Sequence, residues 1–98
     1  MVTEVVLFRI LPEFSPEEFL AAAADMQPVV SAMPGFIDRE LLHNEEGQWI
    51  DIVHWNTLEE AHQAAHTLET AASAGRFMQM IDVQTINMMH LHPRFTTA

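Results

Sequence analysis

The chain has 98 residues, of which 49% are hydrophobic, so we expect residues 1–98 to form one small folded domain. Its net charge is −10 and its four basic residues are all arginines, which excludes a basic phosphate-binding surface and therefore nucleic acids, and disfavours anionic membranes. The lack of cysteine excludes disulfides, thiolate nucleophiles, iron–sulfur clusters and cysteine-based zinc sites.

Residues 2–11, VTEVVLFRIL, are rich in branched and aromatic side chains and predict a strand. Both faces of this strand are apolar, with Val6, Phe8 and Ile10 on one face and Val5, Leu7 and Leu11 on the other. Such a strand is usually central in its sheet and covered on both sides. The segment contains Glu4 and lacks a basic N-terminal region, so it predicts neither a signal peptide nor a membrane span, and we expect a soluble cytoplasmic protein.

A helix is predicted next, beginning after Ser15 and ending at the MPG sequence of residues 33–35. Ser15 is a favourable N-cap residue, Pro16 suits the first helical position, and Glu18 completes a capping box. Pro28 lacks the N–H that a helix interior needs, so we expect a kink or a restart just before it.

A hairpin follows the helix. Residues 36–43 and 48–55 predict two strands, joined by the short turn NEEG at residues 44–47. Gly47 can adopt the positive φ angle that a turn of this kind requires.

The rest of the chain predicts a second helix and a last strand. Thr57 and Glu60 predict a second capping box, and the helix that they begin continues to about residue 74, with Gly75 ending it. The sequence RFMQMI then predicts one short extra turn, and residues 84–91 predict the last strand.

The predicted order is β-α-β-β-α-β, the ferredoxin-like pattern of the α+β class. It lays two helices over one face of a four-stranded antiparallel sheet. Because the first strand is apolar on both faces, the second face of the sheet also needs a cover, and a second copy of the chain is the simplest one. We therefore expect a homodimer.

Two histidines, His62 and His66, are four residues apart in the second predicted helix, next to Glu59 and Glu69. Neutral imidazoles at this spacing are good ligands for Zn²⁺ or Ni²⁺. The apolar stripe of the same helix places both of them toward solvent, and its members are Leu58, Ala61, Ala65, Leu68 and Ala72. The sequence supplies no third ligand, so we expect an exposed helix face and no metal site.

His54 and His90 share their strand faces with apolar residues. Imidazole titrates near neutral pH, so either histidine is a candidate general base for a phenolic proton. His54 is the first choice, because it ends a central strand beside the start of the second helix, whose partial positive charge would stabilise a phenolate. The alternative for both is a structural position in the core or in an interface.

Trp55, Phe77 and Met88 are candidates for the apolar wall of a binding pocket. Methionine side chains adapt their shape, so a wall that contains them would suit a flat aromatic ligand. The alternative is that these residues simply fill the core.

Four stretches of this chain resemble the antibiotic-biosynthesis-monooxygenase domain, a dimeric α+β barrel, and they are MPGFIDRELL, GQWIDIVHW, TLEEAHQAA and MIDVQTINM. The resemblance implies a homodimer whose sheets pack face to face, with a pocket in each subunit between the sheet and the helices. It also implies a range of functions: cofactor-free oxygenation of polycyclic phenols, haem degradation, or no catalysis.

The haem-degrading branch of that family has an Asn on the first strand, a Trp on the second helix and an axial His nine residues after that Trp. When the family pattern is aligned on Pro12, Leu7 falls at the Asn position. When it is aligned on the HW and Glu-Ala sequences, Ala65 and Ala74 fall at the Trp and His positions. We therefore expect no haem to bind. Leu7 stands at a ligand-binding position of the family pattern. We therefore include it, with Trp55, Phe77 and Met88, among the expected substrate-binding residues.

Three functions remain open from the sequence. The first is a cofactor-independent monooxygenase that acts on a small aromatic or polycyclic phenolic substrate and needs neither metal nor flavin. The alternative is a non-catalytic dimeric binding module for a hydrophobic ligand, and the third is a dimerisation unit with a filled core. A cavity would argue against the third function, and a polar group inside that cavity would favour the first.

Overall fold

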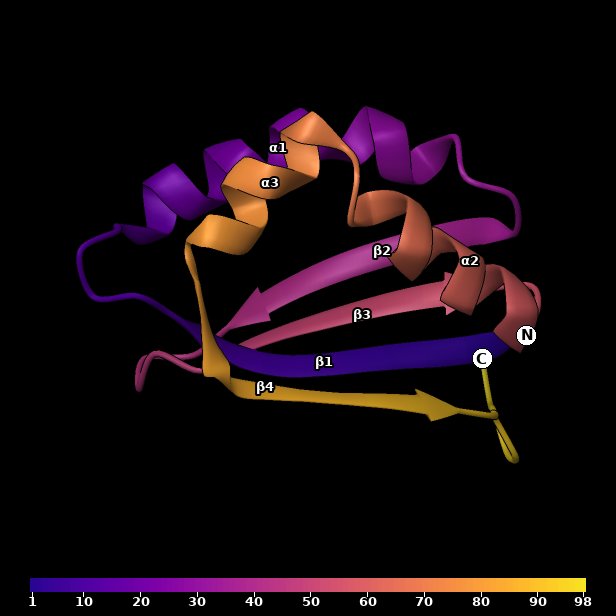
Figure 1. The fold of residues 1–98 in the computed structure, drawn as a ribbon. Coiled ribbons are helices and arrows are strands. Elements are labelled where there is room, and N and C mark those ends of the chain that lie inside the picture. The colour runs from indigo at the N-terminus through magenta and orange to yellow at the C-terminus, as the bar shows by residue number, and fades with distance from the viewer.

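The computed structural model describes residues 1–98, except for the side chain of Ser73. Its elements, labelled in Figure 1, are β1 (Val2–Ile10), α1 (Pro16–Ser31), β2 (Phe36–His43), β3 (Trp49–Trp55), α2 (Leu58–Leu68), α3 (Ala72–Gln79) and β4 (Ile81–Leu91). This is the predicted α+β, ferredoxin-like arrangement with one additional helix, α3.

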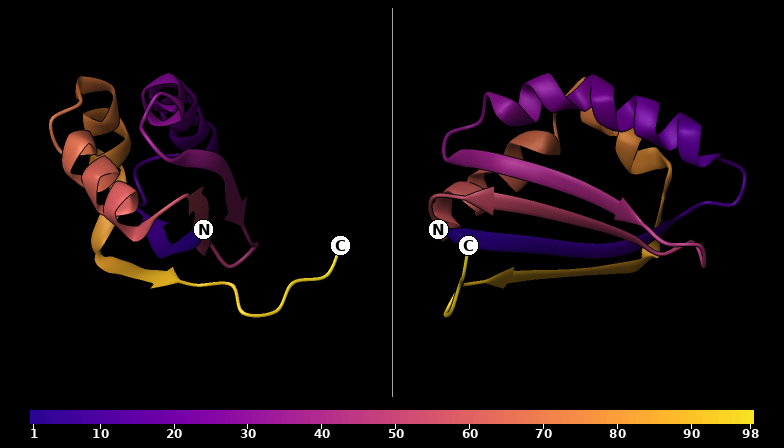
Figure 2. Two further views of the ribbon diagram at one scale, coloured as in Figure 1. Left: turned by 90° about the vertical axis from the view of Figure 1, so that its right-hand side faces the viewer. Right: turned by 180° about the vertical axis from the view of Figure 1, so that it is seen from behind.

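The four strands form one antiparallel sheet in the order β2-β3-β1-β4. All three helices lie over the same face of this sheet, and α3 packs beside α1 (Figure 1). The core lies between the two layers and is built around the fully buried rings of Phe8 and Phe19. The last residues, 92–98, leave the sheet after β4 and extend away from it (Figure 2).

The start of α1 confirms the predicted capping box. The Ser15 hydroxyl accepts a hydrogen bond from the backbone N–H of Glu18, and the Glu18 carboxylate accepts one from the backbone N–H of Ser15. The helix then continues through Pro28 to Ser31, so the expected restart does not occur. The buried side chains Met26 and Val30 lie on either side of the proline, and their packing keeps this turn helical.

The segment after β3 differs from the sequence prediction. Helix α2 ends at Leu68 rather than near residue 74, and Gly75 lies inside α3 instead of ending a helix. A turn at Thr70 redirects the chain, so that Ala74 and Phe77 of α3 become buried against the core. Strand β4 also begins three residues earlier than predicted, at Ile81.

The buried stripe of α2 also differs from the helical-wheel prediction. Ala61 and Ala64 are buried, whereas Ala65 is exposed. Helix α2 packs on the central strands β1 and β3, and Ala61 and Ala64 are the residues that it buries. Thr57 caps the helix, because its hydroxyl oxygen accepts from the backbone N–H of Glu60. The Glu60 carboxylate accepts from the Thr57 hydroxyl, whereas in the predicted capping box it would accept from the Thr57 backbone N–H.

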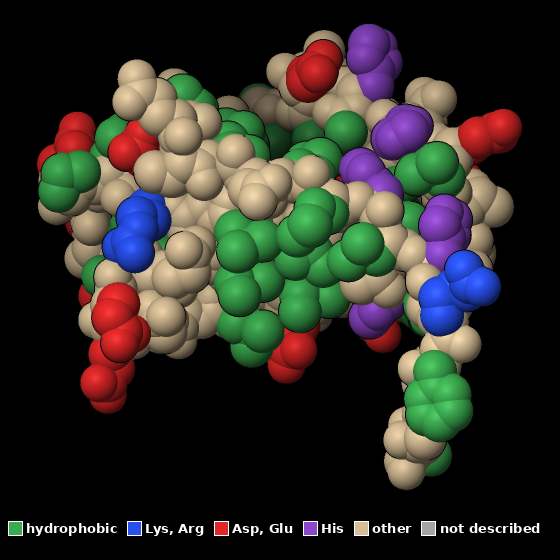
Figure 3. Space-filling view, turned by 90° about the horizontal axis from the view of Figure 1, so that it is seen from below, with side chains coloured by type: hydrophobic (Ala, Val, Ile, Leu, Met, Phe, Trp, Pro, Cys, Tyr) green, Lys and Arg blue, Asp and Glu red, His purple; other side chains and the backbone are tan. Residues whose placement is uncertain are grey.

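The two faces of the sheet are very different. Val6 and Phe8 of β1 face the helices, so strand alternation places Val5 and Leu7 on the opposite, open face. Figure 3 shows this open face from below, with a hydrophobic patch at its centre. By strand pairing, the patch contains Val5, Leu7, Leu42, Ile50, Ile52 and Met89. Among the described residues, no helix is long and apolar enough to cross a membrane.

Candidate functional site

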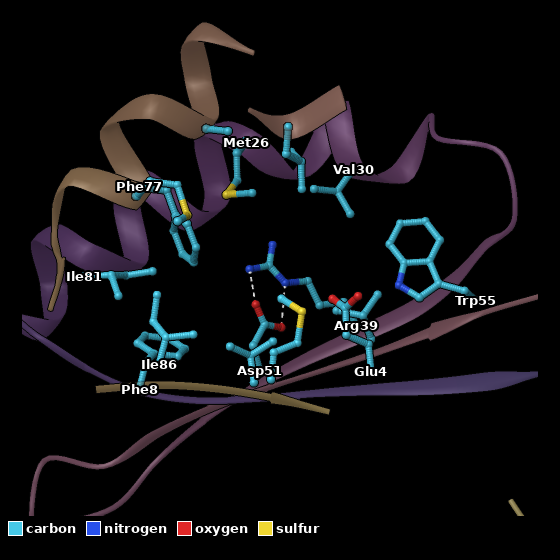
Figure 4. Close-up of a pocket in the computed structure, with 16 residues that line it drawn as sticks. Glu4, Phe8, Met26, Val30, Arg39, Asp51, Trp55, Phe77, Ile81 and Ile86 are labelled. Carbon is cyan, nitrogen blue, oxygen red and sulfur yellow. Dashed lines mark hydrogen bonds and ion pairs between the residues drawn. The ribbon is translucent and has the colours of Figure 1, made fainter. Parts of the chain in front are cut away.

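A cavity of about 140 Å³ lies between the sheet and the helices (Figure 4). Strands β1, β2, β3 and β4 supply its floor, and α1, α2 and α3 supply its roof. Most of its lining is apolar, and this part includes Val6, Phe8, Met26, Val30, Val53, Phe77, Ile81 and Ile86. Polar groups enter at Glu4, Arg39, Asp51 and Trp55. An apolar cavity with a few polar groups is typical of a small-molecule site.

Arg39 and Asp51 form an ion pair on the floor of this cavity. The Arg39 Nε donates to one carboxylate oxygen at 2.9 Å and Nη2 donates to the other at 2.7 Å. The third guanidinium nitrogen donates to Gln27 of α1 at 3.1 Å, and the Phe77 ring lies over the guanidinium carbon. Both side chains of the pair are about nine-tenths buried. Two parallel bonds offset the cost of burying these charges and hold both groups in one orientation.

The indole nitrogen of Trp55 is buried and has no hydrogen-bond partner among the described residues. Figure 4 shows this nitrogen on the ring edge that faces the Glu4 carboxylate and the interior of the cavity. A buried N–H without an acceptor costs roughly 1–3 kcal/mol. The oxygen of a bound ligand would remove this cost, so Trp55 marks the place for an acceptor atom.

Glu4 enters the cavity from β1 and pairs with His90 of β4. The His90 Nε2 lies 2.9 Å from Glu4 Oε1, and both side chains are largely buried. Burial raises the pKa of Glu4 above its ordinary value of 4.5, and the neighbouring Asp51 acts in the same direction, whereas His90 and Arg39 oppose the rise. Glu4 therefore holds a proton more readily than an exposed carboxylate does.

The structure separates the predicted site residues into two groups. Trp55, Phe77 and Met88 line the cavity, and His90 lies directly behind Glu4. His54 and Leu7 lie on the open face of the sheet, outside the cavity. His54 is bound there to a neighbouring strand, with its Nδ1 2.5 Å from Asp38 Oδ1.

The two histidines of α2 do not form a cluster of metal ligands. The His66 side chain is 79% exposed and lies 3.7 Å from Glu69, whereas His62 places its ring edge against His90, with 5.1 Å between the ring centres. Over the part of the chain that the structure describes, no group of three or more His, Asp or Glu side chains is placed to hold a metal ion.

Sequence reasoning missed three residues of this site: Glu4, Arg39 and Asp51. A signal was present in the third strand, WIDIVHW, because Asp51 shares a face there with Trp49 and Trp55. A lone carboxylate on an aromatic face requires a buried cation, and the chain has only four arginines to supply one. The same reasoning applies to Glu4 on the face of Val6 and Phe8.

The three positions that the family resemblance links to haem are occupied by Leu7, Ala65 and Ala74, and they lie differently with respect to the cavity. Ala74 lines the cavity, but a methyl group cannot ligate iron. Leu7 and Ala65 do not line it at all. A cavity of about 140 Å³ is also well below the roughly 300–1,000 Å³ typical of pockets for larger ligands.

Solved structures with the same fold cover almost the whole chain. SnoaB, a cofactor-independent oxygenase from Streptomyces nogalater, is 21% identical with a TM-score of 0.80, over 97% of this chain and 94% of its own. A mutant of MhuD with manganese protoporphyrin IX bound is 20% identical with a TM-score of 0.79, over 100% and 99% of the two chains. Rv0793 from Mycobacterium tuberculosis is 11% identical with a TM-score of 0.72, over 99% and 98%.

The comparisons by sequence point the same way as the fold. No curated protein sequence matches the chain. The model of the family described as antibiotic biosynthesis monooxygenase matches residues 1–74, which include β1, α1, the β2–β3 hairpin and α2. The chain belongs to the antibiotic biosynthesis monooxygenase family.

Proposed function

We propose that this protein is a cofactor-independent monooxygenase that oxidises a hydroxylated aromatic compound of one or two rings. The observation that carries this proposal is the indole N–H of Trp55, which has no partner among the described residues and lies in a mostly apolar cavity. A phenolic oxygen would accept from this N–H while the aromatic ring occupies the apolar part. Membership of the family and the similarity in fold to SnoaB support the reaction class.

The size of the cavity favours a small substrate. A closed apolar cavity of about 150 Å³ accommodates benzene, so the 140 Å³ here suits one aromatic ring fully enclosed. Met78 and Met88, which line the cavity, are 45% and 48% exposed, and their flexible side chains leave room for a second ring to extend outward. A three-ring anthrone would project further into solvent.

The chemistry needs no external reductant. For 1-naphthol, the overall reaction is 1-naphthol plus O₂ giving 1,4-naphthoquinone plus water, so one oxygen atom enters the product and the other leaves as water. The substrate supplies all four electrons. Removal of the hydroxyl proton makes the ring electron-rich enough to react with O₂, and the Trp55 N–H stabilises the resulting oxyanion.

We also propose that the working form is a homodimer. The open face of the sheet carries a central apolar patch (Figure 3), and the same face holds the Asp38–His54 pair. A second copy of the chain would bury the patch, as expected from the two-sided hydrophobicity of β1.

A comparison of two tryptophan variants tests the function. Trp55→Phe keeps an aromatic ring but loses the N–H, so we expect affinity for 1-naphthol to fall roughly 10- to 100-fold, the usual value of a hydrogen bond to a charged oxygen. Trp49→Phe is the matched control, because Trp49 is equally buried but does not line the cavity. The measurements are ligand affinity, oxygen consumption and quinone formation.

The outcomes of this experiment separate the functions. Binding and quinone formation by the wild-type protein, with loss in Trp55→Phe and little change in Trp49→Phe, support the proposal. If the wild-type protein binds 1-naphthol without consuming oxygen, the protein is a binding module. Equal losses in the two variants would contradict the role of the Trp55 N–H.

A further inference from the structure

Two carboxylates line the cavity, and they differ in what they can do. Both oxygens of Asp51 accept hydrogen bonds from Arg39, which keeps this carboxylate ionised and occupied. Glu4 uses Oε1 for His90, and its other oxygen makes no hydrogen bond within the described residues. Glu4 is thus the carboxylate that is able to receive a proton from a ligand.

His90 connects Glu4 to the surface. The two residues are directly opposite each other on β1 and β4, and their side chains are 13% and 19% exposed. The His90 ring also meets the edge of His62, which lies on the exposed side of α2. Titratable groups therefore extend from the cavity to solvent without an apolar gap.

The charges that face Glu4 come from every neighbouring element. Arg39 of β2 and Asp51 of β3 lie on the cavity floor, and because they bind each other their net charge is zero. His90 of β4 is the direct partner, with His62 of α2 beyond it. With the ion pair internally neutral, the low polarity of the cavity raises the pKa of Glu4, so its ionised form is a stronger base than an exposed carboxylate.

We infer that Glu4 is the general base that accepts the hydroxyl proton of the aromatic substrate, and that His90 passes this proton to solvent. This inference rests on the proposed function. The substrate O–H bond breaks, a Glu4 O–H bond forms, and the electron pair stays on the substrate oxygen, which accepts from the Trp55 N–H. When the neutral imidazole of His90 carries its proton on Nδ1, Nε2 is free to take the proton from Glu4, and the imidazolium then releases the Nδ1 proton to water.

The first test uses 4-nitrophenol, because its ionised form is yellow and its neutral form is nearly colourless. At a fixed pH below the pKa of the free phenol, binding to the wild-type protein should increase the yellow fraction. Glu4→Gln keeps the size and polarity of the side chain but cannot accept a proton, so bound 4-nitrophenol should remain neutral. Glu45→Gln is the control, because Glu45 is an exposed carboxylate of the turn between β2 and β3, outside the cavity.

Turnover of 1-naphthol gives the second readout. Loss of a positioned general base lowers a rate by roughly 10²–10⁴, so we expect this loss in Glu4→Gln, with the affinity changed only a few-fold. Equal ionisation of 4-nitrophenol by wild type and Glu4→Gln would overturn the role of Glu4 and leave the cavity as a binding site. Failure of the wild-type protein to bind any phenol would instead remove the proposed function and this inference together.

The role of His90 is tested by chemical rescue. His90→Ala should reduce turnover, and added imidazole should restore it in a concentration-dependent manner, because the partly exposed site is open to a free base. The same imidazole should leave Glu4→Gln unchanged. A His90→Ala variant that folds normally by circular dichroism but shows no rescue would show that His90 only positions Glu4.

Discussion

At the scale of single residues, the cavity is defined by charges that depend on one another. Asp51 is surrounded by aromatic and apolar side chains, and Arg39 is the group that makes its burial tolerable. Arg39 in turn is held by Gln27 and by the Phe77 ring. A change to one member of this set therefore affects the stability of the fold as well as the shape of the site.

We expect Asp51→Asn to destabilise the protein by about 3–5 kcal/mol, because it leaves the buried Arg39 guanidinium without a counter-charge. The double variant Arg39→Met/Asp51→Leu removes both charges and should recover much of this loss. Urea unfolding of the three proteins measures these differences. A single variant as stable as wild type would show that the pair is solvated in solution.

Glu4 should make stability depend on pH. Its pKa in the folded chain is raised by burial, whereas in the unfolded chain it returns to about the ordinary 4.5. Between these two values the folded state holds a proton that the unfolded state has released, so the free energy of unfolding decreases as pH rises through this interval. Glu4→Gln should lack this decrease, whereas Glu45→Gln should keep it. Urea unfolding across the acidic range checks this, and identical pH profiles for wild type and Glu4→Gln would contradict it.

At the scale of elements, the region between α2 and α3 shows how packing overrides local signals. From the sequence, Gly75 is expected to end the second helix. In the structure the chain has already turned at Thr70, and Gly75 lies within α3. Gly35 and Gly47 are different, because both have positive φ angles, of 83° and 85°. At Gly35 an added Cβ would also clash with the Glu60 side chain.

Gly75→Ala should therefore stabilise the protein by about 0.5–1 kcal/mol, because alanine is the better helix former and its Cβ meets nothing within 4 Å. Gly35→Ala should destabilise it, because of both the positive φ and the close contact. Thermal unfolding of the two variants measures the contrast. Destabilisation by Gly75→Ala would favour the helix end that the sequence predicts.

At the scale of the whole molecule, the sheet separates a closed face from an open one. The closed face holds the cavity, and the open face carries the apolar patch and the Asp38–His54 pair. His54 is thus better placed for contact with a second copy than for contact with a ligand. This division explains why β1 is apolar on both of its faces.

Ile52→Glu should convert the proposed dimer into a monomer, because it places a charge at the centre of the open face, on β3. Leu20→Glu introduces the same charge on the exposed side of α1 and should leave the dimer intact. Sedimentation at micromolar concentrations distinguishes the two states. A monomeric wild-type protein would contradict the dimer.

The sequence by itself determined the order of the four strands and the first two helices, the alternation of each strand, the Ser15 capping box and the Gly47 turn, because each depends on residues a few positions apart. It named Trp55, Phe77 and Met88 as candidates for a pocket wall, with plain core as the alternative, and all three line the cavity. Only the tertiary structure decided which sheet face the helices cover, and this placed His54 and Leu7 outside the cavity. It also brought together Glu4 and His90, which are 86 positions apart, and Arg39 and Asp51 across the hairpin. Strand periodicity tells which residues share a face, but only the packing of helices on that face makes it the interior.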